Sequence, residues 1–383
     1  MLAPEPFFAP RGTPLSVCAR IKALTRLGHM VHLITYHLGE NIHLERTKIL
    51  RTPPLFFIRR VKIGASAAKI PLDFLLLLKA SVQLVKEDYD LIFSHEEAAL
   101  IGVLLAKIWK LPHIYDMHSS LPQHVENLSF LGRRFLKEIL LWMEAFILKK
   151  TQSVLVISPS LYRRVKEKGY SAKTFLIENF MDLCEPAFAE EQAQRIRKKW
   201  APAGEKIVLY TGNFQSYQGL TLLLEAAVEM KEKYTVFVLV GGTRSQIEKM
   251  KKRAKALQIT DKLRFTGEVP PSEIPLLLSA ADALVSARLR GTGIPLKLYS
   301  YLRSGKPVVA TRLSPHTQIL DEKTSILVSP DAKSLAEGLT YALFHPEARI
   351  RAQLAKERAD REYTSSLYIE KMNEIVRIAL SGA

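Results

Sequence analysis

The sequence predicts an α/β protein built from two doubly wound domains that face each other across a cleft. Short apolar runs rich in β-branched residues alternate with longer segments of helical periodicity along most of the 383-residue chain. The alternation occurs as two similar arrays, separated by a stretch that contains Pro186 and Pro202. Alternating strands and helices form parallel sheets with helices on both faces, and the chain is too long for one ordinary domain. The two arrays therefore indicate two such domains.

The first array begins with a short apolar segment that runs into a loop of proline and glycine at 10–14. We expect this segment to be the end of a first strand whose beginning lies upstream. Further strands are expected at 31–36, 55–61, 91–94, 113–115, 153–157 and 174–177, and helices at 15–27, 72–86, 98–109, 131–150 and 160–168. The last long helix, 131–150, has a wide apolar face and basic ends, so it either packs in the core or lies in a membrane interface.

The second array repeats this order. Strands are expected at 207–210, 235–240, 263–266, 283–287, 307–310 and 325–328, and helices at 220–230, 244–257, 272–280, 296–303, 333–343, 348–361 and 365–380. We predict a first domain over 1–185, with a linker over 179–203, and a second domain over 186–365. The C-terminal helix at 366–383 is left open in this assignment, since it could pack back on the first domain.

The stretch 283–320 predicts an anion site. It contains a strand, a glycine-rich turn at 291–293 and a helix, and it carries no Asp or Glu. Lys297 falls in the first turn of that helix, where the helix dipole disfavours a cation by about 0.3–1 kcal/mol unless an anion lies beside it. Backbone N–H groups at a helix start also favour anions. Either a bound ligand supplies the missing negative charge, or Lys297 is a solvated surface lysine.

The composition narrows the classes of partner and compartment. The formal net charge of +17 is spread over both halves without a block of like charges, which favours a phosphorylated substrate or an anionic membrane surface over nucleic acid. Cys18 and Cys184 provide neither a disulfide framework nor a metal-binding spacing. No apolar run reaches the roughly 18–20 residues that span a bilayer, and the N-terminus lacks a signal-peptide pattern. We expect a cytoplasmic protein, with peripheral contact to the inner face of the membrane left open.

Polar residues at the ends of predicted strands mark candidate sites in the first domain. His118 follows the strand at 113–115, and His95 with Glu96 follows the strand at 91–94. Open parallel sheets bind ligands at the carboxyl ends of their strands, so His118 is the strongest candidate histidine. The triplet Asp-Tyr-Asp at 88–90 either holds a metal ion that bridges a diphosphate or forms a solvated turn.

Together these segments resemble the family 4 (group 1) glycosyltransferases, a retaining, nucleotide-sugar-dependent family with two facing Rossmann-like domains (the GT-B architecture). The resemblance covers nearly the whole chain and rests on the order and spacing of short motifs. These are Pro-Arg-Gly-Thr-Pro at 10–14, Leu-Gly-His at 27–29, Asp-Met-His at 116–118, Ile-Glu-Asn at 177–179 with Asp182, Tyr-Thr-Gly-Asn at 210–213, Phe-Thr-Gly-Glu-Val at 265–269 and the run at 295–311.

The resemblance implies a role for each matching residue. His118 would contact the donor sugar near the reacting carbon, and Thr292 occupies the other catalytic position. Gly12 and Thr13 would approach the donor diphosphate. The acceptor side would include Arg11, His95 and Glu96. The remaining donor-binding positions are Gly212, Asn213, Gln218, Val269, Arg288, Gly293, Ile294, Pro295, Leu296, Lys297 and Ser300. No metal ion or cofactor is expected, since the nucleotide-sugar is a substrate.

The chain departs from the family pattern at four positions. The family's two glutamates, which usually hold the donor-sugar hydroxyls and the ribose, are replaced by Thr292 and Ser300. The Arg and Lys that usually clamp the diphosphate are replaced by Asn213 and Gln218. Because a buried diphosphate without cations would be very costly, we predict that other cations take over. The candidates are Lys297, Arg288 and Arg290.

These observations predict a metal-independent retaining glycosyltransferase of hexosyltransferase type. It would move a sugar from a nucleotide-sugar donor to a glycan or lipid-linked acceptor in the synthesis of cell-surface polysaccharide, lipopolysaccharide or glycolipid. The basic charge fits an anionic or lipid-linked acceptor at a membrane surface. Two alternatives remain. One is a sugar-nucleotide epimerase or phosphorylase of the same fold, and the other is a non-catalytic glycosyltransferase-like binding protein, which the lost carboxylates favour.

Overall fold

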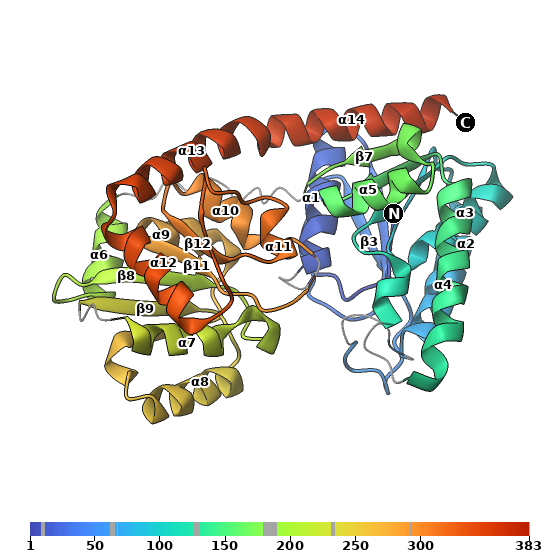
Figure 1. Ribbon diagram of the computed structural model, residues 1–383. Coiled ribbons are helices and arrows are strands. Elements are labelled where there is room, and N and C mark those ends of the chain that lie inside the picture. Colours follow the sequence, from blue (N-terminus) through green and yellow to red (C-terminus); the bar gives the residue numbers. More distant parts are fainter. Residues whose placement is uncertain are drawn as a thin grey trace. The chain divides into compact units, whose positions relative to one another are not determined.

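The computed structural model describes residues 1–8, 12–61, 66, 68–125, 130–178, 190–230, 234–291 and 293–382. The chain divides into two compact units (Figure 1). The first contains Met1–Phe180 together with Ser365–Ala383, and the second contains Met181–Thr364. Each unit is built on one sheet of parallel strands with helices packed on it, so the prediction of two doubly wound α/β units is confirmed.

The sheet of the first unit has the strand order β3-β2-β1-β4-β5-β6-β7. Its strands are β1 (Leu2–Ala3), β2 (Val31–Thr35), β3 (Thr47–Arg51), β4 (Ile92–His95), β5 (His113–Met117), β6 (Ser153–Val156) and β7 (Thr174–Leu176). The strand order reverses between β1 and β4, which are hydrogen-bonded neighbours although far apart in sequence. Ligands bind outside the carboxyl ends of the strands at such a reversal.

The strand predicted at 55–61 is wrong. β3 lies earlier, at Thr47–Arg51, and pairs in parallel with Val31–Thr35 of β2. Residues 52–61 form neither helix nor strand. Pro53 and Pro54 cannot donate backbone hydrogen bonds to a ladder, whereas β3 mixes charged and apolar residues and lacks a continuous apolar run.

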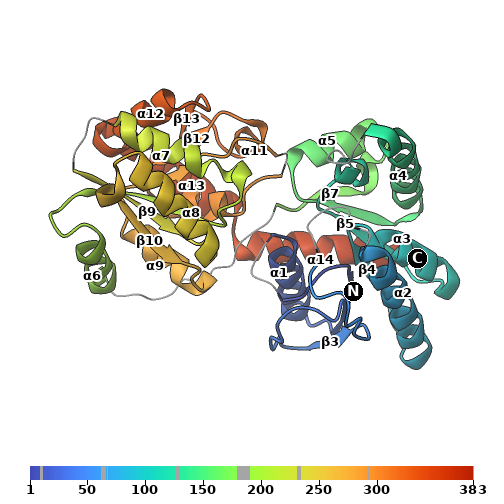
Figure 2. The same ribbon diagram turned by 90° about the horizontal axis from the view of Figure 1, so that it is seen from below.

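The helices of the first unit are α1 (Gly12–Arg26), α2 (Lys69–Lys86), α3 (Ala98–Trp109), α4 (Phe130–Lys150), α5 (Pro159–Glu167) and α14 (Ser365–Ser381). The C-terminal helix α14 packs against α1 and against β5 and β6. On another side of the unit α2, α3 and α4 lie next to one another (Figure 2). Among the described residues, the structure has no helix that combines the length and the apolar character needed to cross a bilayer.

The sheet of the second unit has the strand order β10-β9-β8-β11-β12-β13 and reverses between β8 and β11. Its strands are β8 (Lys206–Thr211), β9 (Thr235–Val240), β10 (Leu263–Gly267), β11 (Ala283–Ser286), β12 (Val308–Thr311) and β13 (Ile326–Val328). Its helices are α6 (Glu190–Trp200), α7 (Leu220–Glu229), α8 (Arg244–Ala256), α9 (Ile274–Ser279), α10 (Lys297–Arg303), α11 (Ser314–Thr317), α12 (Ala332–Phe344) and α13 (Pro346–Glu362).

Helix α6 lies inside the stretch predicted as a linker. Its composition is strongly charged, and only Ala193 and Trp200 are buried, so its apolar periodicity is weak. Glu190 and Glu191 occupy its first turn, and its last turn is basic. This distribution stabilises a helix through its dipole, which is the signal that the linker prediction overlooked.

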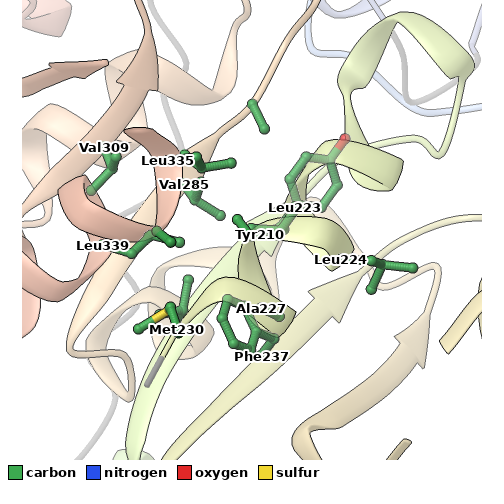
Figure 3. Packing of buried hydrophobic residues seen from close by; sticks show 14 of the residues in the cluster. Tyr210, Leu223, Leu224, Ala227, Met230, Phe237, Val285, Val309, Leu335 and Leu339 are labelled. Carbon is green, nitrogen blue, oxygen red and sulfur yellow. The ribbon is translucent and has the colours of Figure 1, made fainter. Parts of the chain in front are cut away.

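The core of the second unit lies between its sheet and the helices α7 and α12. Figure 3 shows Tyr210 of β8, Leu223 of α7 and Phe237 of β9 within this cluster. Leu335 and Leu339 of α12 complete it, and all five side chains are fully buried. Burial of one such apolar side chain contributes about 1.5–3 kcal/mol. The same cluster contains buried residues of both β8 and β11, the two strands at the reversal.

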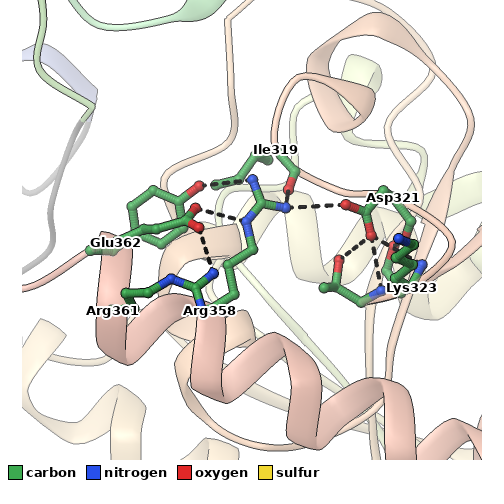
Figure 4. Close-up of polar contacts among 9 residues, drawn as sticks. Ile319, Asp321, Lys323, Arg358, Arg361 and Glu362 are labelled. Carbon is green, nitrogen blue, oxygen red and sulfur yellow. Dashed lines mark hydrogen bonds and ion pairs between the residues drawn. The ribbon is translucent and has the colours of Figure 1, made fainter.

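A polar cluster fixes the loop that precedes β13. Arg358 of α13 donates to the backbone oxygen of Ile319 at 3.1 Å and to Asp321 at 3.3 Å. Its Nε also donates to Glu362 at 2.9 Å (Figure 4). The Arg358 guanidinium therefore links this loop to α13, the last helix of the second unit.

Candidate active-site residues in the two units

In the first unit, polar side chains gather at the carboxyl ends of β4 and β5. His95 is the last residue of β4, Asp116 lies in β5, and His118 follows one residue after that strand ends. Because β4 and β5 are parallel neighbours that pair His95 with Asp116, these side chains meet. Asp116 and His95 are fully buried, and His118 is almost so.

One oxygen of Asp116 is the centre of this group. Asp116 Oδ2 lies 3.2 Å from His95 Nδ1 and 3.3 Å from His118 Nε2. The same oxygen accepts a hydrogen bond from Nε of Arg20 in α1 at 2.9 Å. The two imidazole nitrogens are 3.4 Å apart. The carboxylate thus orients both rings, and His118 is the one closest to the surface.

The electrostatics of the group are set by Arg20. Burial alone would raise the pKa of Asp116, but the Arg20 guanidinium and the contacts with His118 and His95 hold it well below its usual range. Burial lowers the pKa of His95 to about 4, against the opposing influence of Asp116. At neutral pH the structure therefore contains a charged Arg20–Asp116 pair and a neutral His95.

Sequence reasoning missed Arg20 and Tyr368. Arg20 is fully buried on the apolar side of α1, between Val17 and Ile21, and an arginine at such a position was the available signal. Its guanidinium donates to the hydroxyl of Tyr368 from α14. Nothing local in the sequence marks Tyr368, because its partner is 348 residues away.

The His95, Asp116 and His118 side chains could also ligate a metal ion, since one atom of each lies within 4.8 Å of the others. Arg20 already binds the carboxylate, and its positive charge opposes a second cation there. The Asp88-Tyr89-Asp90 triplet lies at the turn before β4, and both of its aspartates are exposed. This turn is at the opposite end of β4 from His95.

In the second unit, the main feature is the buried ammonium of Lys297, at the start of α10. Its Nζ is inaccessible to solvent and has no hydrogen-bond partner among the residues that the structure describes. It lies 3.8 Å from the centre of the Tyr210 ring, at the end of β8. Burial, followed by the charge of Arg288, moves the pKa of Lys297 well below its ordinary value. Within the described part of the chain, Nζ therefore has no negative partner.

Arg288 lies beside it, two residues after β11. Its Nη1 donates to the backbone oxygen of Gly293 at 2.6 Å, and its guanidinium stacks over Tyr217 at 5.1 Å. Its Nε is buried, and no described residue accepts a hydrogen bond from it. The two cations therefore meet at the β8–β11 reversal with unused donors. Arg290, the third predicted cation, is exposed and contacts the Ser216 hydroxyl at 3.4 Å, so it does not belong to this group.

The loop after β8 also lies close to Lys297. Gln218 is buried and donates to the Asn213 side chain at 3.4 Å, while its own Oε1 has no partner in the ranges that the structure describes. Gly219 has φ +72°, and a Cβ there would lie 1.7 Å from the backbone oxygen of Ala287. The loop can thus reach β11 only with glycine at this position. At Gly212 a Cβ would lie 3.9 Å from Lys297 Nζ, so Lys297 faces this loop.

The other predicted residues are distributed as follows. Gly293 is exposed, Pro295 is buried, and Ile294, Leu296 and Ser300 are half-buried around the start of α10. Val269 lies in the loop after β10, at the edge of the sheet and apart from the reversal. In the first unit, Gly12 and Thr13 open α1, and Glu96 follows β4 and binds the Ser119 hydroxyl. Arg11 and Thr292 lie outside the described residues.

Likeness to solved structures defines the class of the fold. The structure of HepE from Anabaena, solved with UDP and with UDP-glucose, matches this chain with a TM-score of 0.76 in the UDP complex. That match covers 98% of both chains at 16% identity. WaaG, described as a glycosyltransferase involved in lipopolysaccharide biosynthesis, matches with a TM-score of 0.73 at 16% identity, again over 98% of both chains. The fold is therefore the GT-B fold of glycosyltransferases.

Sequence comparison shows the family. The pattern of Glycosyltransferase Family 4 matches residues 11–185, and that of Glycosyl transferases group 1 matches residues 192–359. The phosphatidyl-myo-inositol mannosyltransferase of Mycobacterium tuberculosis is 22% identical over the whole chain and 97% of its own length. The alpha-monoglucosyldiacylglycerol synthase of Streptococcus pneumoniae is 23% identical over 78% of this chain and 67% of its own. The chain belongs to the family 4 (group 1) glycosyltransferases, which confirms the predicted resemblance.

Proposed function

We propose that this glycosyltransferase moves a hexose from a nucleotide-sugar donor to a glycan or lipid-linked acceptor, with retention of the anomeric configuration and without a metal ion. The observation that carries the proposal is the buried Lys297 Nζ at the β8–β11 reversal, which has no partner among the described residues. A cation buried there without a carboxylate is suited to the diphosphate of a donor, whose charge would satisfy it. Arg288 supplies a second cation for the same anion.

The relatives support the donor and acceptor classes. HepE binds UDP and UDP-glucose, which favours a nucleotide-sugar donor here. Two relatives are named as an alpha-monoglucosyldiacylglycerol synthase and a phosphatidyl-myo-inositol mannosyltransferase. Both names refer to lipids, which favours a lipid acceptor in glycolipid or cell-surface polysaccharide synthesis. A cytoplasmic protein with peripheral contact to the inner face of the membrane would meet such an acceptor.

The proposed reaction uses the protein mainly for alignment and charge stabilisation. The acceptor oxygen forms a bond with the anomeric carbon as the bond from that carbon to the diphosphate oxygen breaks. The acceptor proton passes to the departing diphosphate on the same face. Lys297 and Arg288 stabilise the negative charge that develops on the diphosphate, a task that Mg²⁺ performs in other phosphate sites. His118, held by Asp116, contacts the donor sugar.

The test is a thermal-shift screen with UDP-, GDP-, ADP- and dTDP-sugars, first without metal and then with Mg²⁺. A ligand at 100 times its dissociation constant stabilises the folded state by about 2.7 kcal/mol. The expected result is a metal-independent shift with one nucleotide, followed by NMR detection of a retained anomeric configuration in the product. Donor turnover without acceptor would instead indicate an epimerase, and the absence of any shift would indicate a non-catalytic protein.

A further inference from the structure

The outer faces of α2, α3 and α4 expose an unusual number of large apolar side chains. On α2 the exposed residues recur every three or four positions, so they form one stripe. They are Ile70, Phe74, Leu78, Val82 and Val85, with exposed fractions between 46% and 78%. The opposite side of α2 is buried against the sheet through Leu72, Leu76 and Ala80. This helix is therefore apolar on two sides, and the core uses only one of them.

The neighbouring elements extend the stripe. On α3 the exposed apolar residues are Leu104 and Ile108, and on α4 they are Phe135, Ile139 and Trp142. The turn after β3 exposes Phe56 and Phe57 by 83% and 78%. The next residue, Ile58, is buried in the same core cluster as Leu72, which places this turn beside α2. We name this combined surface the α2–α4 face.

The charges on the three helices of the α2–α4 face are almost all positive, whereas the turn after α2 carries the exposed carboxylates of Glu87, Asp88 and Asp90. Among the described side chains of the three helices, the only exposed carboxylate is Glu138, because Asp73 binds the Tyr36 hydroxyl and Glu144 binds Lys168. The exposed basic residues are Lys86, Lys107, Arg134, Lys137, Lys149 and Lys150 on the helices, together with Arg59 and Arg60 beside the phenylalanine turn. Apolar side chains within a basic surface are typical of elements that lie in a membrane interface.

We propose that the α2–α4 face docks on a bilayer that contains anionic lipids. The phenylalanines and Trp142 would enter the boundary between headgroups and acyl chains, and the basic side chains would contact lipid phosphates. A second copy of the chain is a poorer occupant. Two-fold pairing would set the same basic surface against itself, and like charges would then oppose the contact. This proposal gives a location to the membrane contact included in the proposed function, but it needs no donor for its test.

The experiment measures cosedimentation of the full chain with vesicles of phosphatidylcholine, with and without phosphatidylglycerol. We expect binding that needs phosphatidylglycerol and weakens with salt, together with a blue shift of tryptophan emission that Trp142→Phe abolishes. In the double variant Lys86→Ser/Lys107→Ser, each lost charge should reduce vesicle partitioning about fivefold. The apolar variant Phe57→Ser/Phe74→Ser should also release the protein.

Two matched controls lie on the second unit. Lys249→Ser/Lys252→Ser removes two exposed charges from α8, and Ile350→Ser/Leu354→Ser removes two exposed apolar residues from α13. The proposal is wrong if these controls lose as much binding as the α2–α4 variants, if anionic vesicles are not bound, or if the α2–α4 variants instead abolish a dimer in light scattering. Melting curves with nucleotide-sugars are run on every variant. An unchanged donor shift with lost vesicle binding separates this face from the donor site.

Discussion

Replacing Lys297 with methionine should have opposite effects on the free protein and on donor binding. Methionine preserves most of the side chain's volume and removes its charge. In the free protein Nζ is buried and finds no partner in the described part of the chain, and a buried unsatisfied group costs about 1–3 kcal/mol. Lys297→Met should therefore raise the free energy of unfolding by about this amount. The melting temperature of the second unit should rise by several degrees as a result.

Donor binding should fall in the same variant. Removing one partner of a buried charge pair costs about 2–5 kcal/mol, which corresponds to a loss of affinity between about 30-fold and several thousand-fold. The stability gain also has a predicted pH dependence. Because the folded-state pKa of Lys297 is lowered, the penalty is full below that pKa and is relieved as the pH rises towards about 10.4, the ordinary value.

Calorimetry and thermal unfolding of the same preparations would measure both effects. The matched control is Arg312→Met, which removes an exposed cation of the same segment that is paired with Glu322. It should leave donor affinity unchanged. If Lys297→Met bound the donor as tightly as the natural protein, the assignment of Lys297 as a diphosphate ligand would be refuted. If it lost stability without ligand, the ammonium must have a partner in the folded state.

Four further results are expected. Ser300→Glu should lower donor affinity in calorimetry, although it restores a residue typical of the family, whereas an increase would contradict the role given to Lys297. Tyr368→Phe removes a hydrogen bond to the Arg20 guanidinium and should cost about 1.5–3 kcal/mol in urea unfolding; no change would mean that α14 does not stabilise Arg20. Gly219→Ala should destabilise the second unit severely, because the φ of Gly219 and the nearby backbone oxygen of Ala287 exclude a Cβ. Gly293→Ala should not, because a Cβ there would meet no described atom within 4 Å. Equal melting temperatures for the two variants would count against this loop geometry. Stability should also fall as the pH drops from about 6.5 towards 4, by up to about 2 kcal/mol per group at pH 5, because burial keeps three histidines neutral in the folded state only; a flat urea profile over this range would contradict it. These are His95, His113 and His316, whose pKa values burial lowers to about 4, 3 and 4.

The fold was accessible from the sequence because its strands are buried parallel strands. Such strands are continuous apolar runs, and β9 (Thr235–Val240) was predicted with its observed bounds. The helix α3 was likewise predicted at 98–109. Prediction was poorer where burial was partial. The edge strand β3 carries Lys48 and Arg51, so its position depends on pairing with β2 rather than on its own pattern.

The candidate site was accessible in part. The absence of acidic residues along 283–320 is a local property, so the sequence indicated that this stretch offers Lys297 no carboxylate. The sequence left open whether Lys297 is solvated, and the structure buries its Nζ. The orientation of the Arg290 side chain could not be predicted from neighbouring residues, because it contacts Ser216, which is 74 positions away in the sequence. The contacts that hold Asp116 join residues 96 positions apart, and the contact of Arg20 with Tyr368 spans 348. Only the folded chain brings these residues together.

The family resemblance places a glutamate where this chain has Ser300, and we infer that this difference suits the donor role proposed for Lys297. Ser300 lies three residues after Lys297 on α10, a spacing at which oppositely charged side chains pair. A glutamate at 300 would therefore give the Lys297 ammonium a partner within the protein. That partner would raise the pKa of Lys297 and balance its positive charge before a ligand binds. With serine at that position the charge stays unsatisfied, and a diphosphate can supply what the protein does not. On the proposed assignment of Lys297, the absence of the carboxylate favours donor binding, so it does not argue for loss of function.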